Sequence, residues 1–473
     1  MYVHIKFDNL SFKSKGLCLN AMIRLLTVLL LILVSVLLHA QQWVDSRQQD
    51  IVIQSVNVVP MDEERVIPNQ TVVIKDGKIT AIGTKVKHAK NALVIDGKGK
   101  YLMPGLAEMH AHVPPIDDIE PMKEVLFLFA ANGITTIRGM LGHTRHLELR
   151  GMIQRGEING PRFYTTGPSF NGLSVKTAEA GAEMVRKQKE AGYDFLKLHP
   201  GLNLETFPAI ASTAKEVGIP FAGHVSFAVG VWRAIDAGYS SIDHLDGFVE
   251  ALVPGIDSLT EQQAGLFGMF IGHKADQSGI PKLMKALKEK NIWVVPTQSL
   301  AERWFSPAFD ADGFRNDPHS KYMNPKTVDQ WIQSKKSLQA NPNYNPVQLE
   351  SFIILRRQLI LECQKNGVGI LLGCDAPQVF NVPGFSTHHE LAYLVDSGLT
   401  PYQAIKTGTV NVAEYLKLAD SGTIRIGAIA DLILVNNNPL VEIKNTQSIA
   451  GVMLNGKWLS KKEIDVGLKK LEK

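Results

Sequence analysis

The sequence is poor in cysteine and nearly balanced in charge, and both properties exclude classes of protein. Its 473 residues include three cysteines, Cys18, Cys363 and Cys374, of which Cys18 lies in an amino-terminal segment that we expect to be removed. Two cysteines form no disulfide framework, so packing must hold the core together. The chain has 50 Lys and Arg against 46 Asp and Glu, and without residues 1–40 the balance is 46 against 45. A basic surface for nucleic acid or anionic lipid is therefore not indicated.

The hydrophobic run near the amino terminus is too short to cross a membrane. It covers residues 25–38, follows several basic residues and precedes Ala40-Gln41-Gln42. A spanning helix needs about 20 residues, whereas this layout is typical of a secretory signal peptide. We therefore expect residues 1–40 to be removed, with a start at Met1 or Met22, and the mature protein to be secreted or periplasmic. The alternative, an uncleaved membrane anchor, is disfavoured by the length of the run.

No glycine-rich phosphate turn follows the first predicted strand, which disfavours a doubly wound open sheet. Instead, an amphipathic helix repeatedly ends at a Gly or Asn, and an apolar strand follows within two residues. This pattern occurs at Gly133, Gly192, Gly218, Gly238, Asn291 and Gly367. With strands predicted over 101–112 and 161–166, eight strands alternate with helices. The sequence thus predicts an α/β fold, a (β/α)8 TIM barrel over residues 104–419, with functional sites at the carboxyl ends of its strands.

The flanks of this region alternate apolar and polar residues. Residues 51–100 contain a hairpin signal at Asp76-Gly77, and residues 430–459 contain one at Asn455-Gly456. We expect residues 41–103 and 420–473 to form one small β-sandwich domain from both ends of the chain. Residues 305–346, between the seventh strand and its helix, are polar and rich in Asn, Pro and Asp. They form either a lid over the catalytic face or a surface excursion without function.

Two histidines, His110 and His112, lie one residue apart in an extended segment after Pro104-Gly105. Side chains at i and i+2 of a strand point to the same face, so both imidazoles project together. Two neutral imidazoles on one face suit a borderline metal such as zinc. The pair alone is weak evidence, because a chain with 14 His can contain it by chance.

Three further candidate ligands end other predicted strands, which strengthens the case. His224 closes residues 220–224, His244 closes residues 241–244, and Asp375 follows the apolar residues 369–374. A lone strand-end His is usually only a hydrogen-bonded polar residue. A carboxylate at such a point, however, is costly unless it binds a cation or a proton-bearing partner. Because the strand ends of a barrel converge, we expect these side chains to meet the two histidines.

Lys197 lies inside an apolar strand, Phe195-Leu196-Lys197-Leu198, where an unpaired ammonium is expensive. A buried lysine tends to lose its proton and become nucleophilic. Carboxylation by CO2 would convert it into an anionic oxygen ligand able to bridge two metals. The alternative is a lysine that is salt-bridged or extends to solvent. His199, two residues further on, points to the same face and is a candidate for metal or substrate contact.

Together these residues resemble the amidohydrolase superfamily, closest to its imidazolonepropionase-like branch, which includes metal-dependent Xaa-Pro dipeptidases. Pro104-Gly105-Leu106 followed by His110-Ala111-His112 looks like the first-strand signature of this superfamily. The other similar stretches are residues 133–138, 160–162, 388–391, 398–401 and 422–439. The resemblance covers essentially the whole mature chain. It is specific for the superfamily and says little about the substrate.

The resemblance implies a role for each candidate. It places His110, His112 and Asp375 on the more buried metal, His224 and His244 on a second metal, and carboxylated Lys197 between them. Asp375 would also be the general base that takes a proton from a metal-bound water molecule. His388 is the first candidate for a substrate contact, with His199 and Arg138 as further ones. The chain departs from the family pattern at Glu108, where Asp is usual, and at Gly139, where an acid is usual.

The sequence therefore predicts a hydrolase that cleaves a carbon–nitrogen bond of a small substrate: a dipeptide, an N-acyl amino acid or a cyclic amide. The expected cofactor is Zn2+, two per chain if Lys197 is carboxylated. The alternatives are a mononuclear imidazolonepropionase-like cyclic amidase, a non-catalytic metal-binding barrel, and a hydrolase of esters or phosphotriesters. No nucleic-acid partner is expected, nor a membrane after removal of the signal peptide. The oligomeric state stays open, a homo-oligomer included.

Overall fold

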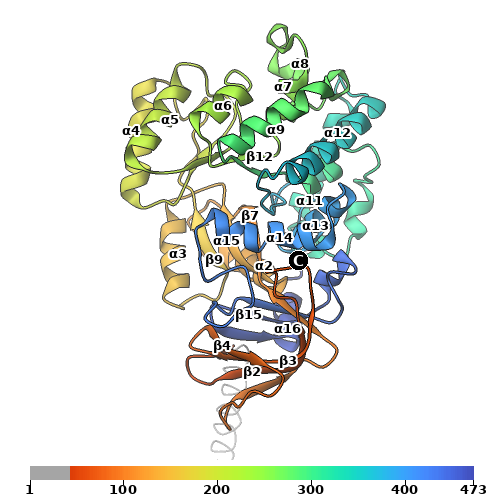
Figure 1. Ribbon diagram of the computed structural model, residues 1–473. Helices are drawn as coiled ribbons and strands as arrows, with labels where there is room; N and C mark the ends of the chain where they lie inside the picture. Colours follow the sequence, from red (N-terminus) through yellow and green to blue (C-terminus); the bar gives the residue numbers. More distant parts are fainter. Residues whose placement is uncertain (1–42) are drawn as a thin grey trace, which may run out of the picture. The chain divides into compact units, whose positions relative to one another are not determined.

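The computed structural model describes residues 43–473, so the predicted signal peptide lies outside the described residues. Strands from both ends of the chain form one mixed sheet, in which the red-orange and dark-blue strands of Figure 1 lie side by side. Its order is β16-β15-β14-β6-β2-β3-β4, and β5 pairs with β2. The strands are β2 (Ile51–Val58), β3 (Ile67–Lys75), β4 (Lys78–Gly83), β5 (Leu93–Asp96), β6 (Tyr101–Pro104), β14 (Leu432–Val435), β15 (Ile449–Leu454) and β16 (Lys457–Ser460), preceded by β1 (Val44–Asp45).

The two predicted hairpin turns of this sheet are confirmed. Asp76 and Gly77 have φ values of 51° and 74°, and Asn455 and Gly456 have values of 49° and 76°. Positive φ at both central residues is what a type I′ turn requires, and Asn-Gly and Asp-Gly tolerate it best. The predicted pairing of the two chain ends is also confirmed, because β6 runs antiparallel to β14 with Leu102 opposite Leu434.

Seven strands in the middle of the chain are parallel and form two sheets. One contains β7 (Leu106–Ala111), β8 (Ile134–Gly139) and β9 (Arg162–Thr165). The other contains β10 (Leu196–Leu198), β11 (Phe221–Gly223), β12 (Ser241–Asp243) and β13 (Trp293–Val295). Both are almost entirely buried, as apolar strands covered on both faces should be. The fold is thus α/β with mixed and parallel sheets, which confirms the predicted α/β class.

Backbone hydrogen bonds continue beyond the edges of these two sheets. Between β9 and β10, Asp194 N donates to Thr165 O at 3.0 Å and Phe170 N donates to Lys197 O at 2.9 Å. The predicted eighth strand is irregular, and in it only Ile370 forms a β-bridge, to Val294 of β13. On its other side, Met109 N of β7 donates to Leu372 O at 2.8 Å. Residues 369–376 therefore lie between β13 and β7.

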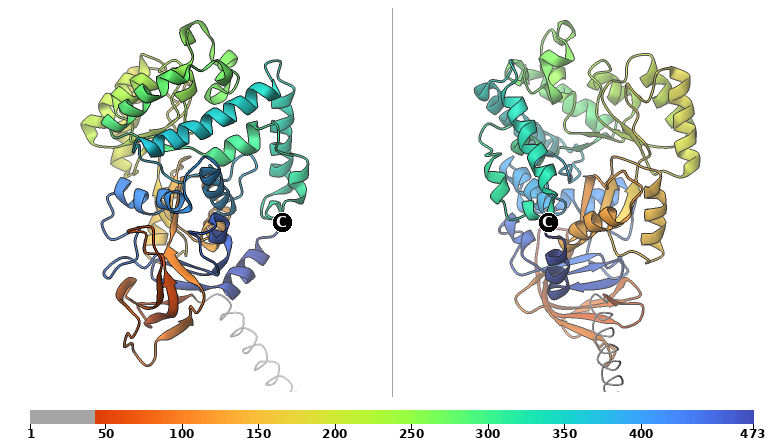
Figure 2. Two further views of the ribbon diagram at one scale, coloured as in Figure 1. Left: turned by 45° about the vertical axis from the view of Figure 1, so that its right-hand side comes forward. Right: turned by 180° about the vertical axis from the view of Figure 1, so that it is seen from behind.

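Helices flank the parallel strands on their outer side (Figure 2). All six predicted helix-ending residues adopt the left-handed conformation, among them Gly192 (φ 85°), Gly218 (φ 66°) and Asn291 (φ 52°). The helices are α2 (Glu120–Ala131), α3 (Arg145–Gln154), α4 (Ala178–Ala191), α5 (Thr206–Val217), α6 (Val231–Ala237), α7 (Phe248–Leu252), α8 (Glu261–Ala264), α9 (Ile280–Glu289), α10 (Gln298–Leu300), α11 (Pro325–Gln339), α12 (Pro346–Lys365), α13 (Phe385–Asp396), α14 (Pro401–Thr407), α15 (Val410–Tyr415) and α16 (Lys461–Lys470). Within residues 43–473, no helix combines the length and hydropathy that crossing a membrane requires.

The long segment 305–346 is built around α11. The helix buries Val328, Trp331 and Ile332, and the Trp331 ring lies 6.0 Å from the Phe314 ring. Lys335 of the same helix donates to the carbonyl oxygens of Arg303 and Ser306. The segment thus packs against the residues that directly follow β13.

Candidate metal centre

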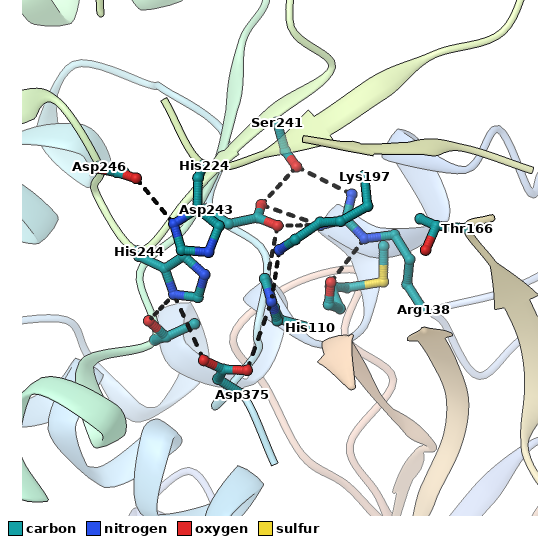
Figure 3. Close-up of polar contacts among 12 residues, drawn as sticks. His110, Arg138, Thr166, Lys197, His224, Ser241, Asp243, His244, Asp246 and Asp375 are labelled. Carbon is teal, nitrogen blue, oxygen red and sulfur yellow. Dashed lines mark hydrogen bonds and ion pairs between the residues drawn. The ribbon is translucent and has the colours of Figure 1, made fainter. Parts of the chain in front are cut away.

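The predicted ligands come from different strands and meet at one place (Figure 3). His110 lies in β7 and Lys197 in β10, while His224 and His244 directly follow β11 and β12. Asp375 comes from the irregular segment between β13 and β7. The parallel arrangement brings these carboxyl-terminal ends together, so residues far apart in sequence become neighbours.

His110, His112 and Asp375 are the tightest group. One ligand atom of each lies within 4.8 Å of the others. His112 Nε2 is 2.8 Å from Asp375 Oδ1, and His110 Nε2 is 3.6 Å from the same oxygen. His244 Nδ1 reaches the second oxygen, Oδ2, at 3.9 Å. The carboxylate therefore stands between imidazoles from three segments.

The imidazoles are crowded and buried, which keeps them neutral. The His244 ring centroid is 4.4 Å from that of His110 and 4.4 Å from that of His224. Burial, followed by the charge of Lys197, lowers the pKa of His224 to about 3. Burial also holds the pKa values of His110 and His244 well below the usual range. A neutral imidazole is the form that binds a metal ion.

Lys197 is fully buried and adjoins the group, with Nζ 3.1 Å from His110 Nε2. Burial lowers the pKa of its ammonium to about 8, although Asp243 and Asp375 oppose the shift. Gly223 on the neighbouring strand leaves room for this side chain. A Cβ at position 223 would lie 2.4 Å from Leu198 O and 2.9 Å from Lys197 Cδ. The local sequence therefore admits a long side chain into the centre of the parallel strands.

Buried acceptors without a partner indicate that this group suits a cation. Among residues 43–473, His112 Nε2, His244 Nε2 and Asp375 Oδ1 are buried and have no partner in hydrogen-bond geometry. Buried polar atoms are normally satisfied, and leaving one unsatisfied costs about 1–3 kcal/mol. Two of these unpartnered atoms, His112 Nε2 and Asp375 Oδ1, belong to the converging group that also contains His110, and imidazole nitrogens with a carboxylate oxygen are a donor set for a borderline metal such as zinc.

Two of the candidate ligands have a backbone conformation that is uncommon for residues other than glycine. His244 has φ 65° and Asp375 has φ 67°. Both follow an extended segment, and the left-handed residue turns the chain so that its side chain points into the group. Such conformations cost about 1–3 kcal/mol and occur preferentially at functional sites.

A second layer of residues, which the sequence reasoning missed, orients the histidines. Asp243 is fully buried, and its Oδ2 lies 2.8 Å from His110 Nδ1, out of line for a linear hydrogen bond. Asp246 Oδ2 lies 3.0 Å from His224 Nδ1, and the hydroxyl oxygen of Thr297 lies 2.9 Å from His244 Nδ1. The sequence contained a signal for Asp243, which directly precedes His244: a carboxylate in a buried strand is rarely unpaired, so a partner was to be expected.

Two of the three predicted substrate contacts are engaged with the protein itself. Arg138 is fully buried and donates to Met109 O at 2.7 Å and to Asp243 Oδ1 at 3.2 Å. Figure 3 shows its guanidinium beside Asp243 and Ser241. His388 is buried too, with Nδ1 2.9 Å from the Thr446 hydroxyl oxygen and Nε2 2.9 Å from Asn132 O. Neither residue has a free polar atom for a substrate, so both are left out of the site proposed below.

His199, the third predicted substrate contact, does adjoin the group. Its ring centroid lies 5.1 Å from that of His224. Burial and the charge of Lys197 lower its pKa. Its role as a substrate contact stays a prediction.

The two departures from the family pattern have structural explanations. Glu108 is buried and accepts hydrogen bonds from Cys374 N at 2.8 Å and from the Thr387 hydroxyl at 2.8 Å. It thereby connects β7 to the segment that bears Asp375. At Gly139, a Cβ would lie 2.7 Å from the Phe163 ring. The aromatic ring takes the space that a side chain at position 139 would need.

Comparison with known proteins identifies the family of the chain. Residues 101–459 match the model of the amidohydrolase family. The 5-methylthioadenosine/S-adenosylhomocysteine deaminase of Caldanaerobacter subterraneus subsp. tengcongensis is 22% identical over 457 residues, covering 87% of this chain and 93% of that protein. The 5'-deoxyadenosine deaminase of Methanosarcina mazei is 48% identical, but only over 64 residues, or 13% of this chain. That match spans 15% of the relative's length.

A solved structure supports the fold. A Xaa-Pro dipeptidase with bound methionine in the active site has a TM-score of 0.63 and 21% sequence identity. The match covers 87% of this chain and 100% of the dipeptidase. The match of residues 101–459 to the family model confirms the family resemblance predicted from the sequence.

Proposed function

Because the chain belongs to the amidohydrolase family and is a hydrolase of carbon–nitrogen bonds, we propose that it hydrolyses the amide bond of a small substrate. The substrate is a dipeptide, an N-acyl amino acid or a cyclic amide. The observation that carries the proposal is the convergence of four imidazoles, a carboxylate and a buried lysine at the ends of parallel strands.

The proposal includes a closed (β/α)8 barrel over residues 104–419 as the frame of the site. The backbone bonds between β9 and β10, and on both sides of residues 369–376, support closure of the two parallel sheets into one ring. Residues 41–103 and 420–473 form the accompanying small domain, as a β-sandwich. Their pairing through β6 and β14 supports this part of the proposal.

We propose that the donor set holds two divalent ions. His110, His112 and Asp375 would hold the first ion, His224 and His244 would hold the second, and Lys197, if carboxylated, would supply an oxygen ligand to both. When bound, zinc supplies Lewis acidity and lowers the pKa of a water molecule towards 7. Asp375 is the proton carrier: its oxygens accept a proton from the attacking water and deliver it to the leaving nitrogen. Burial favours the uncharged amine of Lys197, which is the form that reacts with CO2.

Metal analysis tests the assignment. Purified protein supplied with bicarbonate and zinc is expected to contain close to two zinc ions per chain. Lys197→Ala should reduce this to about one and greatly lower amide hydrolysis, because the bridge is lost. Lys335→Ala is the matched control, since Lys335 is also a fully buried lysine but binds only carbonyl oxygens. A folded, active protein without metal would contradict the proposal, and one zinc in both wild type and Lys197→Ala would leave only the mononuclear form.

Deamination is a second candidate, since a relative matched over 87% of this chain is named a deaminase. Both reactions use water to break a carbon–nitrogen bond, so the donor set does not distinguish them. Zinc-loaded protein should therefore be assayed in parallel on a dipeptide library, on cyclic amides and on 5'-deoxyadenosine. An aryl phosphotriester is included as a substrate to test for phosphotriester hydrolysis. Release of ammonia from the nucleoside without dipeptide cleavage would favour the deaminase.

We also propose that the protein is exported, on the strength of the signal-peptide pattern in residues 1–40. Expression of the full chain in a bacterium with a periplasm, followed by amino-terminal sequencing of the mature protein, tests this. Cleavage near Ala40 is expected. An intact amino terminus in the membrane fraction would favour the anchor instead.

A further inference from the structure

A large cavity lies directly behind two of the candidate metal ligands. Its volume is about 690 Å3. It is lined by the loop after β11, by α6 and α7, and by residues 256–270. Asn341 of the long segment after β13 also contributes to its wall.

Two side chains on the cavity wall, Phe267 and Asp246, also contact candidate metal ligands. Phe267 lines the cavity and stacks at 18° on the rings of His244 and His224, at centroid distances of 5.0 and 5.8 Å. Phe267 itself has φ 58° and lies between Gly265 and Gly268, which also have positive φ. This turn places the ring flat against the imidazoles, so the cavity adjoins the site where the bond is broken.

The wall of the cavity is largely apolar and aromatic, and most of its charged side chains are acidic. Phe227, Trp232 and Phe270 supply aromatic surface. The acids on the wall are Asp246, Glu250, Asp257 and Glu261, and the one arginine is Arg233. Arg233 donates to Val229 O, in the loop that precedes α6, and one cation stands against four acids on this wall. The cavity therefore attracts a cation that also carries apolar surface.

Two of these acids are placed to bind such a cation. Asp246 is 6% exposed and uses Oδ2 for His224 and Val225, while Oδ1 has no hydrogen bond within residues 43–473. Glu250 Oε2 is buried and has no hydrogen-bond partner in the same part of the chain. A buried carboxylate oxygen without a donor is unfavourable unless a ligand supplies one. Burial and the neighbouring Asp246 raise the pKa of Glu250 to about 8, and an arriving cation would favour its charged form.

We propose that this cavity is a specificity pocket for substrates that carry an ammonium or guanidinium group on an aliphatic stem. The inference rests on the proposed function, because it assigns the pocket to the substrate of the same metal centre. Glu250 binds the cationic group, and Trp232 and Phe270 cover the stem. Phe267, which lines the cavity and stacks on His244 and His224, lies beside the bound side chain on the side of the metal centre.

The kinetic test compares two dipeptides that differ only in the terminal amine, alanyl-lysine and alanyl-norleucine. Wild-type, zinc-loaded protein is expected to have a kcat/KM for the lysine substrate that is roughly tenfold or more above that for norleucine, as a charge-assisted hydrogen bond provides. Glu250→Gln should bring this ratio close to one. Asp257→Asn is the matched control, because Asp257 lines the same cavity but is solvent-exposed. It should keep the wild-type ratio.

A binding test separates this inference from the proposed function. Titration calorimetry with the free amino acids lysine and norleucine needs no turnover. Tighter binding of lysine that is lost in Glu250→Gln supports the pocket even if no amide is cleaved. Hydrolysis of both dipeptides at equal rates, together with equal binding of both amino acids, would overturn the inference and leave the proposed function standing. An unchanged lysine preference in Glu250→Gln would overturn it as well.

Discussion

The contact between Asp243 and His110 supports the sharpest prediction. Asp243 is fully buried between Arg138 and the imidazole, with Oδ2 2.8 Å from His110 Nδ1 and Oδ1 3.2 Å from Arg138 Nη2. Asp243→Asn keeps the shape of this side chain but removes its charge. The imidazole then loses the anion that orients it and makes its other nitrogen a better ligand.

The expected magnitude follows from this geometry. Loss of a carboxylate partner of a metal-binding histidine typically costs 10–100-fold in metal affinity, or about 1.4–2.8 kcal/mol. The fold should survive, because Arg138 still donates to Met109 O and to the Ser241 hydroxyl. Asp243→Ala is the less useful variant, since an unpaired buried guanidinium costs roughly 3–5 kcal/mol.

The assay is competitive zinc titration against a chelator of known affinity, with thermal unfolding of the metal-free protein as a check on folding. Asp194→Asn is the control, because Asp194 also pairs with an arginine, Arg150 at 2.7 Å, but contacts none of the candidate ligands. It should lower stability slightly and leave zinc affinity unchanged. Wild-type zinc affinity in Asp243→Asn would refute the reasoning.

Three further predictions concern stability and metal content. His388→Gln should destabilise the protein by about 1–3 kcal/mol in denaturant unfolding without a change in KM, because two buried hydrogen bonds are lost; a raised KM at wild-type stability would contradict this. Burial holds the pKa of His388 at about 4, below its usual 6.5. The contribution of His388 to the free energy of unfolding is therefore present above pH 6.5 and is lost as the pH falls through 4. The variant should show a flatter acid limb in stability measured against pH. Gly223→Ala should lower both metal content and unfolding temperature, since its Cβ would overlap Leu198 O and Lys197 Cδ at a φ of 123°; full zinc loading of this variant would argue against it. Removal of zinc by a chelator should lower the unfolding temperature, because a ligand at 100 times its Kd stabilises by about 2.7 kcal/mol, and an unchanged melting curve would count against a resident metal.

The secondary structure and the family could be predicted because their signals are local. A glycine or asparagine that ends a helix acts through its own φ, and all six predicted positions have the left-handed conformation. The Asp76-Gly77 and Asn455-Gly456 turns depend likewise on two adjacent residues. Strand periodicity placed His110 and His112 on one face, and the apolar runs before His224, His244 and Asp375 marked these as strand ends.

The roles of Arg138 and His388 could not be predicted, because they depend on contacts with residues far away in the sequence. Arg138 binds Asp243, which is 105 positions further along the chain, and His388 is hydrogen-bonded to Asn132 O and to the Thr446 hydroxyl. Both residues belong to motifs that mark the family, but a motif does not say whether a polar side chain faces a ligand or the protein. Burial decides this, since a fully buried side chain must satisfy its polar atoms inside the fold.

By itself, then, the sequence determined the α/β class, the family and the candidate metal ligands. Each of these depends on periodicity, on backbone preference or on residue type. Only the tertiary structure decided which acids orient the histidines, which predicted contacts are internal, and where the cavity behind Phe267 lies. These features arise where strands and loops of distant sequence meet, and long-range packing, which local pattern does not record, sets their geometry.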